Sequence, residues 1–276
     1  MAQPDSQGPT YSLGHSEREL ERLSAQARLV EPITRRLFVE AGIGSGMRVL
    51  DVGCGVGDVT FVAADLVGST GEVVGTDRVA TPLEIARKRA ADDDPENVTF
   101  LFGEPTEMSF DLPFDAVVGR YVLMYQADPA AWLRKLLTHL RPGGIAAFHE
   151  PYRDGLRSFP PVPSYDRAWQ LVDDTLRASG ADPCMGIKLH TIFEAAGLPS
   201  PSMRMETLFA GGDCEDHLHH EIDIVSVLLP EAERFGIATG DEASTEALVE
   251  RARAEMSTSG SVVLCRCDVG AWARRP

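Results

Sequence analysis

Over the first 150 residues, apolar runs typical of strands take turns with segments in which apolar residues recur at helical spacing. Short apolar runs typical of buried strands lie at residues 48–52, 72–77, 98–102, 114–119 and 145–149. Segments with apolar residues at helical spacing separate these runs, at 58–67, from 81 to about 91 and from 129 onward. Strands joined by helices of this length form parallel, right-handed crossover units. The pattern therefore predicts an α/β fold with a doubly wound sheet.

Residues 1–42 precede the first predicted strand and have the pattern of two helices. Ser16-Glu-Arg-Glu19 has the form of a capping box, in which the serine and the glutamate satisfy free backbone amides at a helix start. Pro32 suits the first position of a second helix that ends by Gly42. We expect this segment either to cover a ligand pocket as a helical lid or to pad an edge of the sheet.

The second half of the chain is expected to complete the same domain, residues 43–276. Helices are predicted at 164–179 and 188–196, and strands at 202–210 and 261–269. A cap insertion at about 211–260 carries at least two further helices. One has Leu218, Ile222, Val225 and Leu229 on a single face, and the other runs from about 243 to 256.

The most informative motif follows the first predicted strand. Gly53, Gly55 and Gly57 run G-x-G-x-G after Asp51, whereas a dinucleotide fingerprint is spaced G-x-G-x-x-G. Glycine lets the backbone turn tightly and approach a ligand closely, and Cys54 lies inside the turn, where only a small side chain fits. The motif predicts a bound ligand, but its spacing fits a pyrophosphate poorly.

This segment resembles the first motif of the class I S-adenosylmethionine-dependent methyltransferases, in which the glycine turn holds the methionine end of the cofactor. Two further features follow in the family's order: Asp77, 20 residues beyond Gly57, and the Leu-Arg-Pro-Gly-Gly turn at 140–144. The resemblance covers about residues 40–150. It implies S-adenosylmethionine as cofactor, S-adenosylhomocysteine as product, and a Rossmann-like seven-stranded sheet. The last strand of that sheet would be antiparallel and lie between the fifth and the sixth.

The resemblance also implies a set of cofactor-binding residues. They are Asp51, Gly53, Cys54, Gly55, Gly57, Asp77, Arg78, Glu104, Pro105 and Arg120. The carboxylate of Asp77 would accept hydrogen bonds from the ribose hydroxyls. Glu104 would lie near the adenine amino group, although the family commonly has Gly-Asp-Ala where this chain has Gly-Glu-Pro. Arg120, at the end of the fourth strand, could pair with the cofactor's carboxylate.

Candidates for acid–base chemistry lie where the fifth strand ends. His149 and Glu150 are consecutive, and successive strand residues face opposite ways, so we expect one of the two to enter the pocket. The alternative is a structural role in the turn to Pro151. His219 could reach the pocket from the cap insertion as a base. The surrounding run of His and acidic residues, 213–221, matches no defined zinc spacing, and no metal is expected.

Aromatic side chains near the ligand edge are candidates for the pocket of the methyl acceptor. The predicted substrate-binding residues are Tyr11, Tyr125, Tyr152, Arg153 and Trp169. Tyr125 and Tyr152 follow strands that end at this edge, and Arg153 could hold an anionic acceptor. The alternative is that the aromatic rings simply pack in the core.

Charge and composition narrow the partners. The formal net charge is −16 at pH 7 and basic residues are not clustered, which disfavours a nucleic-acid substrate. Five cysteines without framework spacing suggest reduced thiols and a cytoplasmic protein. No run of 18 apolar residues and no signal-peptide pattern occur, so we expect no membrane association. The sequence leaves open whether the protein forms a homodimer.

These observations predict an enzyme that transfers a methyl group from S-adenosylmethionine to O, N or C of a small molecule, in secondary metabolism. Alignment of the nucleophile and exclusion of water would do most of the work, with optional help from a base. One alternative keeps the cofactor site for non-methylating chemistry, as a cyclase, a decarboxylase or a ligand-binding module. A nicotinamide-dependent dehydrogenase is disfavoured by the glycine spacing.

Overall fold

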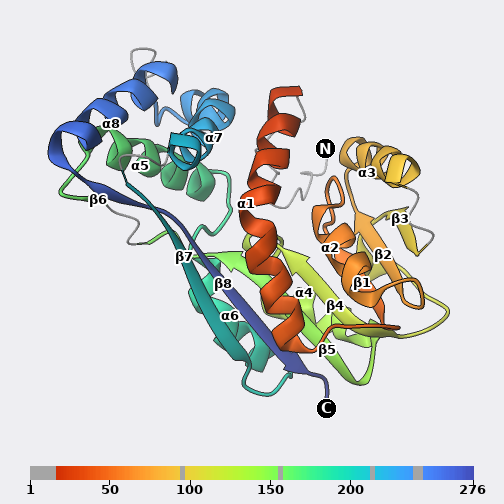
Figure 1. Ribbon diagram of the computed structural model, residues 1–276. Helices are drawn as coiled ribbons and strands as arrows, with labels where there is room; N and C mark the ends of the chain where they lie inside the picture. Colours follow the sequence, from red (N-terminus) through yellow and green to blue (C-terminus); the bar gives the residue numbers. More distant parts are fainter. Residues whose placement is uncertain (1–16, 94–96, 155–157, 212–214, 239–244) are drawn as a thin grey trace, which may run out of the picture.

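The computed structural model describes residues 17–93, 97–154, 158–211, 215–238 and 245–276 (Figure 1). Within these ranges one mixed sheet has the strand order β3-β2-β1-β4-β5-β8-β6, and β7 pairs with β8. The strands are β1 Arg48–Val52, β2 Glu72–Asp77, β3 Val98–Phe102, β4 Phe114–Arg120, β5 Leu140–Pro151, β6 Ser158–Phe159, β7 Ser202–Ala210 and β8 Val262–Arg274. The doubly wound α/β fold predicted from the sequence is confirmed.

The seven predicted strands are all present. β1 to β5 run parallel to one another, and β8 is antiparallel to both β5 and β7, which it separates as predicted. The Arg-Pro-Gly-Gly turn lies inside β5, as an irregularity between the Phe114–Leu140 and Ala116–Ile145 pairs. The two-residue strand β6, which pairs with the start of β8, was not predicted because two residues carry no periodicity.

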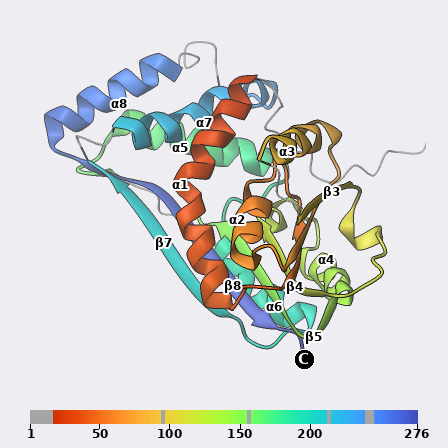
Figure 2. The same cartoon turned by 45° about the vertical axis from the view of Figure 1, so that its right-hand side comes forward.

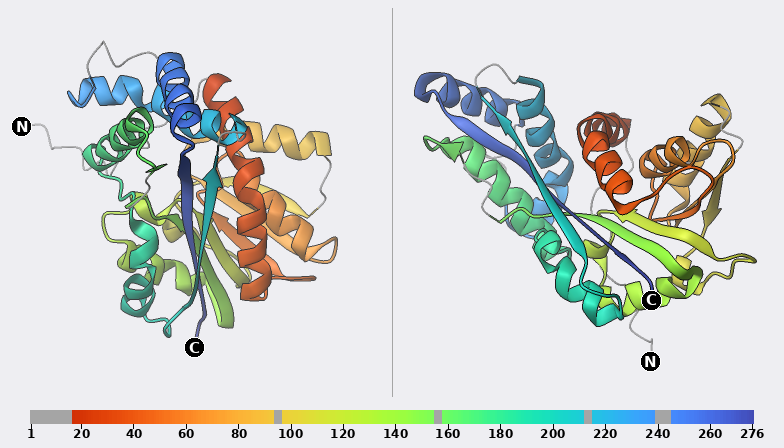
Figure 3. Two further views of the ribbon diagram at one scale, coloured as in Figure 1. Left: turned by 60° about the vertical axis from the view of Figure 1, so that its left-hand side comes forward. Right: turned by 60° about the horizontal axis from the view of Figure 1, so that its bottom comes forward.

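Helices cover both faces of the sheet. They are α1 Glu17–Ala41, α2 Asp58–Val67, α3 Ala80–Asp93, α4 Pro129–Leu136, α5 Pro163–Ala178, α6 Met185–Ala196, α7 Glu215–Arg234 and α8 Thr245–Ser259, with short 3₁₀ turns η1 Pro105–Glu107, η2 Leu123–Tyr125 and η3 Leu137–His139. α1, α2 and α3 lie on one face, and α4 and α6 on the other (Figures 2 and 3). α5, α7 and α8 pack together at the far end of the long β7–β8 pair. The two helices predicted for the cap insertion are therefore confirmed.

The prediction of two N-terminal helices is wrong, because α1 is one continuous helix with Pro32 inside it. Pro32 is exposed, so its ring meets solvent, while Ile33 and Leu37 in the following turn are buried. A proline removes one helical hydrogen bond, and burial of the adjoining apolar face compensates for that loss. The predicted cap Ser16 lies outside the described residues.

Apolar side chains form one cluster on each face of the sheet. On the α1 and α2 face, Phe38 packs with residues of β1, β4 and β5 such as Ile145. On the opposite face, Phe148 of β5 and Phe193 of α6 stack edge to face, 6.2 Å apart. Strands buried on both faces explain the continuous apolar runs in the sequence. This packing holds the carboxyl ends of β1, β2, β4 and β5 rigidly at one edge of the sheet.

Candidate functional site

The glycine turn after β1 is built from three left-handed residues. Gly53, Gly55 and Gly57 have φ angles of 65°, 55° and 91°, a region that other residues adopt at a cost. A Cβ atom on Gly53 would lie 2.5 Å from Val122 Cγ1, and one on Gly57 would lie 3.0 Å from the ring of Phe100. A Cβ on Gly55 would meet nothing within 4 Å. Packing therefore requires the outer two glycines, whereas Gly55 presents bare backbone to open space.

Asp77, the last residue of β2, is hydrogen-bonded to this turn. Its Oδ2 accepts from the amide of Gly55 at 2.8 Å, and its Oδ1 accepts from the amide of Val79 at 2.9 Å. The amide of Cys54 donates to the carbonyl of Thr76 in the same strand, and the Cys54 side chain is buried. Arg78 follows with an exposed side chain. The structure thus brings the predicted ribose-binding carboxylate to the open face of the turn.

Asp51 lies below the turn and is buried. Its Oδ2 accepts a 2.6 Å hydrogen bond from the hydroxyl of Thr60, while its Oδ1 has no hydrogen-bond partner within the described structure. Burial raises the pKa of Asp51 to about 7, and the Thr60 bond opposes that rise. A buried acceptor without a partner next to bare backbone suits a ligand that carries a cationic amino group. The residues present therefore fit the methionine end of S-adenosylmethionine.

Glu104, at the start of η1, is held by a residue that the sequence analysis missed. Its Oε1 accepts from the indole Nε1 of Trp132 at 2.9 Å and from the hydroxyl of Thr106 at 3.2 Å. Pro105 is buried, and its carbonyl lies 2.8 Å from Nε2 of His139. Trp132 belongs to the apolar face of α4, so nothing in its spacing distinguished it from a core residue.

Arg120, the last residue of β4, is largely buried and has protein partners. Its Nη1 donates to the hydroxyl oxygen of Thr34 in α1 at 3.2 Å. Its Nη2 lies 3.9 Å from Oδ2 of Asp58, and Oδ1 of the same carboxylate accepts a 2.7 Å bond from Arg89. Arg120 therefore joins the end of β4 to α1 and to the start of α2, at the edge where the cofactor is expected.

His149 is fully buried on the α1 face of β5. Its Nδ1 lies 3.1 Å from the Thr34 hydroxyl, and its Nε2 lies 3.5 Å from Oδ1 of Asp268 in β8. The same Oδ1 accepts a 2.7 Å hydrogen bond from the hydroxyl of Tyr121. Burial would raise the pKa of Asp268, but the nearby His149, the charge of Arg266 and the hydrogen bond from Tyr121 hold it below its usual value.

Glu150, the next residue of β5, is fully buried on the opposite face. Its Oε1 accepts from the amides of Val122 and Leu123 at 2.9 and 2.8 Å, and its Oε2 accepts from the amide of Met124 at 3.2 Å. Burial raises the pKa of Glu150 to about 8, although these three amides act to lower it. His149 and Glu150 thus face opposite ways as predicted, and both are shielded from solvent.

The structure brings two of the predicted acceptor-binding residues together. The guanidinium of Arg153 lies 3.8 Å from the ring centre of Trp169, and its Nε donates to Oδ1 of Asp173 at 2.5 Å. Nη2 of Arg153 is buried and makes no hydrogen bond within the described structure. Tyr152 is half-buried and Tyr125 is buried in η2. Tyr11 and the side chain of His219 lie outside the described residues.

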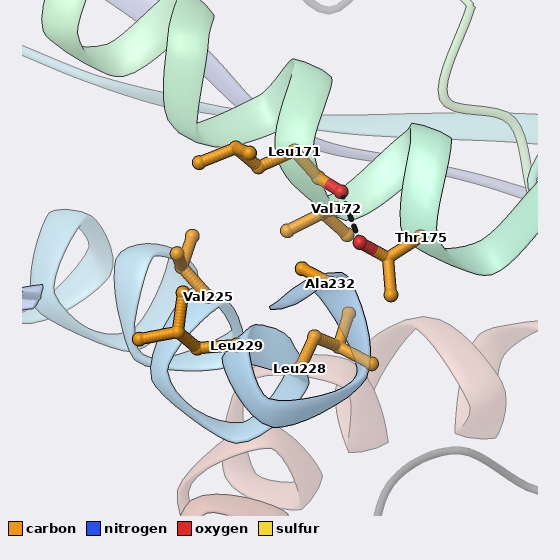
Figure 4. A pocket seen from close by; sticks show the side chains of 7 residues that line it. All are labelled: Leu171, Val172, Thr175, Val225, Leu228, Leu229 and Ala232. Atoms are coloured by element: carbon orange, nitrogen blue, oxygen red, sulfur yellow. Dashed lines mark hydrogen bonds between the residues drawn. The ribbon is translucent and has the colours of Figure 1, made fainter. Parts of the chain in front are cut away.

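A small apolar pocket lies between α5 and α7 (Figure 4). Its lining residues are Leu171, Val172, Thr175, Val225, Leu228, Leu229 and Ala232. The one hydroxyl among them, on Thr175, donates to the carbonyl of Leu171 within the same helix at 2.7 Å. The pocket offers no group for catalysis, and it includes none of the predicted site residues.

Sequence inspection missed several residues of the site. Thr34, Trp132 and Asp268 all contact predicted site residues, yet each lies in an apolar-patterned segment. The one available signal is a charged residue inside an apolar strand, which Asp268 provides in the sequence of β8. Trp132 and Glu104 are 28 residues apart, and Thr34 and His149 are 115 residues apart, so no local pattern contains these relations.

Comparison with known proteins identifies the relatives of this chain. The profile of a methyltransferase domain family matches residues 43–197, more than half of the chain. The demethylmenaquinone methyltransferase of Staphylococcus aureus is 35% identical over 126 residues, which are 45% of this chain and 52% of that protein. The aklanonic acid methyltransferase DauC of a Streptomyces species is 33% identical over 156 residues, 56% of this chain and 69% of that one.

The match with the staphylococcal relative spans about half of that protein's length. Among solved structures, a SAM-dependent methyltransferase from Aquifex aeolicus superposes with a TM-score of 0.55 at 16% identity. It covers 95% of this chain and 100% of its own. At this identity the likeness concerns the fold alone.

Proposed function

Because this chain belongs to the methyltransferase domain family, of the class I S-adenosylmethionine-dependent type, we propose that it methylates a small molecule. The observation that carries the proposal is the geometry of the glycine turn. Gly55 presents bare backbone to open space, Asp77 adjoins it, and a buried oxygen of Asp51 has no partner within the described structure. This arrangement provides a turn, a carboxylate and an acceptor for the two polar ends of the cofactor.

The residues of this chain would bind and orient rather than react. Asp77 would hold the ribose, with Arg78 beside it, and Glu104 would meet the adenine from its position against Trp132. Asp51, the turn around Cys54, and Arg120 would hold the methionine end. The cofactor supplies an already activated methyl group on its sulfonium. The protein then has to align the acceptor atom in line with that group and exclude water.

For the acceptor, we propose a flat molecule with an oxygen substituent. Arg153 and Trp169 form a stacked pair near the end of β5, and the buried Nη2 of Arg153 would gain a partner from a carbonyl, phenolate or carboxylate oxygen. Tyr125 and Tyr152 follow the neighbouring strands. The two relatives are named for demethylmenaquinone and aklanonic acid, so quinones and aromatic acids are the first acceptors to test.

We also propose several further properties of this protein. Residues 1–42 act as a lid, which is supported by the bonds that connect Thr34 of α1 to Arg120 and His149. The protein is cytoplasmic, which is supported by free cysteines at positions such as Cys54 and Cys265. Its substrates are not nucleic acids, as the acidic composition suggests, and it serves secondary metabolism as a monomer or homodimer.

One observation bears on membranes. Within the ranges that the structure describes, none of the helices combines the length and the apolar character needed to cross a bilayer.

The test is to incubate the purified protein with methyl-labelled cofactor and a panel of phenols, quinones and aromatic acids. We expect label in an extracted product together with S-adenosylhomocysteine in equal amount. Conversion of an acceptor without release of S-adenosylhomocysteine would instead support the non-methylating alternative. Absence of both cofactor binding and label transfer across the panel would contradict the proposed function.

A further inference from the structure

We propose that His149 and Glu150, consecutive in β5, are positioning residues that hold residues 120–124 from opposite faces of the sheet. This segment, called here the 120–124 segment, leaves the end of β4 and lies against the glycine turn. The inference rests on the proposed function, because it assigns to the segment the task of shaping the cofactor site. Acid–base catalysis by His149 or Glu150 is not part of it.

Glu150 holds the segment from the α4 and α6 face. One carboxylate accepts the three consecutive amides of Val122, Leu123 and Met124, at 2.8 to 3.2 Å. The carbonyl of Met124 in turn accepts from the amide of Asp182 at 2.8 Å. Three successive amides that point at one buried carboxylate determine the backbone conformation of the turn η2. The Glu150 side chain makes no other hydrogen bond within the described structure, so its task is to support this turn.

His149 holds the segment from the α1 face, through Tyr121. The carbonyl of His149 accepts from the amide of Tyr121 at 2.8 Å, and the two rings lie 5.5 Å apart. Asp268 completes the arrangement, because its Oδ1 accepts from the Tyr121 hydroxyl at 2.7 Å and lies 3.5 Å from Nε2 of His149. β5 and β8 therefore fix both the backbone and the side chain of one residue.

Tyr121 has a backbone conformation that needs such support. Its φ angle of 56° lies in the left-handed region, where tyrosine is disfavoured, and it is the one non-glycine residue of the described structure with a positive φ. A strained residue persists where surrounding contacts over-determine it, and such residues concentrate at functional sites. Here the contacts come from β5 and β8, and they act at the first residue beyond β4.

The position of the 120–124 segment affects the shape of the cofactor site. Val122 fits between two glycines: a Cβ on Gly53 would lie 2.5 Å from its Cγ1, and one on Gly119 would lie 2.7 Å from its Cγ2. Val122 thus packs directly against the glycine turn, and a shift of Val122 changes the contact that supports the turn. Arg120, at the other end of the segment, reaches Thr34, which also contacts His149. Loosening either side of the segment should therefore weaken cofactor binding.

The test compares hydrogen-bond deletions inside and outside this arrangement. Tyr121→Phe removes the bond to Asp268, Asp268→Asn weakens the same contact, and the double variant removes both partners. Tyr165→Phe is the matched control, since Tyr165 is fully buried and its hydroxyl donates to the carbonyl of Leu264 in β8 at 2.8 Å rather than to a partner of the 120–124 segment. Affinity for S-adenosylhomocysteine is measured by calorimetry, and folding by circular dichroism and melting temperature.

We expect Tyr121→Phe and Asp268→Asn each to weaken S-adenosylhomocysteine binding by about tenfold. The double variant should bind S-adenosylhomocysteine no more weakly than either single variant, because the two residues act as one unit. Tyr165→Phe should bind like the wild type even if its melting temperature falls as much. Glu150→Gln should also weaken binding when it is measured above pH 8, where Glu150 is ionised, since an amide supplies one good acceptor where the carboxylate supplies two.

Wild-type affinity in Tyr121→Phe and Glu150→Gln, with melting temperatures lowered as in the control, would overturn the positioning role. Such a result would leave the proposed function intact, because the wild type would still bind and transfer. Failure of the wild type itself to bind S-adenosylhomocysteine would instead overturn the proposed function, and the inference with it. If Asp268→Asn does not fold, the S-adenosylhomocysteine affinities of Tyr121→Phe and Tyr165→Phe still test the positioning role.

Discussion

The amide of Gly55 donates a 2.8 Å hydrogen bond to Oδ2 of Asp77, and this bond joins the turn after β1 to the end of β2. It places the carboxylate beside the one glycine of the turn that faces open space. Two residues 22 positions apart in the chain therefore shape a single ligand surface. Neighbouring parallel strands end at the same edge, which makes this contact possible.

Removal of the Asp77 carboxylate should weaken cofactor binding more than it weakens folding. We expect Asp77→Ala to lower the affinity for S-adenosylhomocysteine by about tenfold or more, because both the turn and the ribose lose a charged acceptor. Asp77→Asn, which keeps one acceptor, should lose less. Calorimetry measures both, with Asp65→Ala as control, since Asp65 is exposed and pairs only with Arg35 on the surface. Equal affinities in all three would contradict the assignment of Asp77.

Alanine substitutions in the glycine turn should separate ligand binding from stability. At Gly55 the new methyl group meets no protein atom, so the cost to folding is the left-handed backbone alone, about 1 kcal/mol. The same methyl group enters the proposed cofactor space and should abolish S-adenosylhomocysteine binding. Gly53→Ala should instead lower the free energy of unfolding by about 3 kcal/mol, because it collides with Val122.

The matched control for Gly55 is Gly197→Ala. Gly197 also has a left-handed φ angle, 96°, and open space around it, but it ends α6 away from the turn. Urea unfolding should show similar losses for the two variants, while only the Gly55 variant loses ligand binding. Wild-type affinity of Gly55→Ala would show that the cofactor does not approach this face.

Stability should fall as the pH rises from about 4.5 to 8, in part because of Glu150. Burial raises its pKa from 4.5 to about 8, so in that window the folded chain keeps a proton that the unfolded chain releases. The proton-bound folded state is favoured at low pH and loses its advantage as the pH rises. Glu150→Gln should flatten the dependence by roughly 2 to 4 kcal/mol across the window. Urea unfolding at a series of pH values measures it, and parallel curves would contradict the prediction.

Arg153 should govern binding of the acceptor but not of the cofactor. Once an acceptor is found, Arg153→Gln is expected to raise its KM by about tenfold, through loss of a hydrogen bond and of the stack on Trp169. Affinity for S-adenosylhomocysteine should stay at the wild-type value. Arg177→Gln is the control, an exposed arginine of α5 whose ion pair with Asp174 is on the surface. An unchanged KM in Arg153→Gln would remove this residue from the acceptor site.

Pro32→Ala should stabilise the protein. Pro32 lies inside α1 with its side chain exposed, so the substitution restores a helical hydrogen bond without changing the buried face. We expect a gain of about 1 to 2 kcal/mol in the free energy of unfolding, after the greater freedom of the unfolded chain is subtracted. Thermal and urea unfolding measure it. A loss of stability would show that the proline bends α1 into a shape that its packing requires.

Features with a local cause could be predicted from the sequence. The strand and helix spans of β1, α2, β2 and β3 agree closely with their patterns. For β1 and β2 the reason is that strands buried on both faces need unbroken apolar runs. The glycine turn could be recognised in the sequence, since each of its three glycines adopts a left-handed φ that residues with side chains disfavour. The sequence by itself determined the fold and the family, and it predicted the glycine turn as a ligand site.

Only the tertiary structure decided which polar groups meet. Asp268 reaches Tyr121 and His149 because β8 lies beside β5, and strand pairing over more than 100 residues leaves no mark on local spacing. α1 continues through Pro32 because the adjoining turn is buried, a stabilisation that the local propensity of proline does not include. His149 and Glu150 were found as candidates, but their partners were not. Hydrogen bonds between distant elements depend on packing, and packing is settled by the whole chain at once.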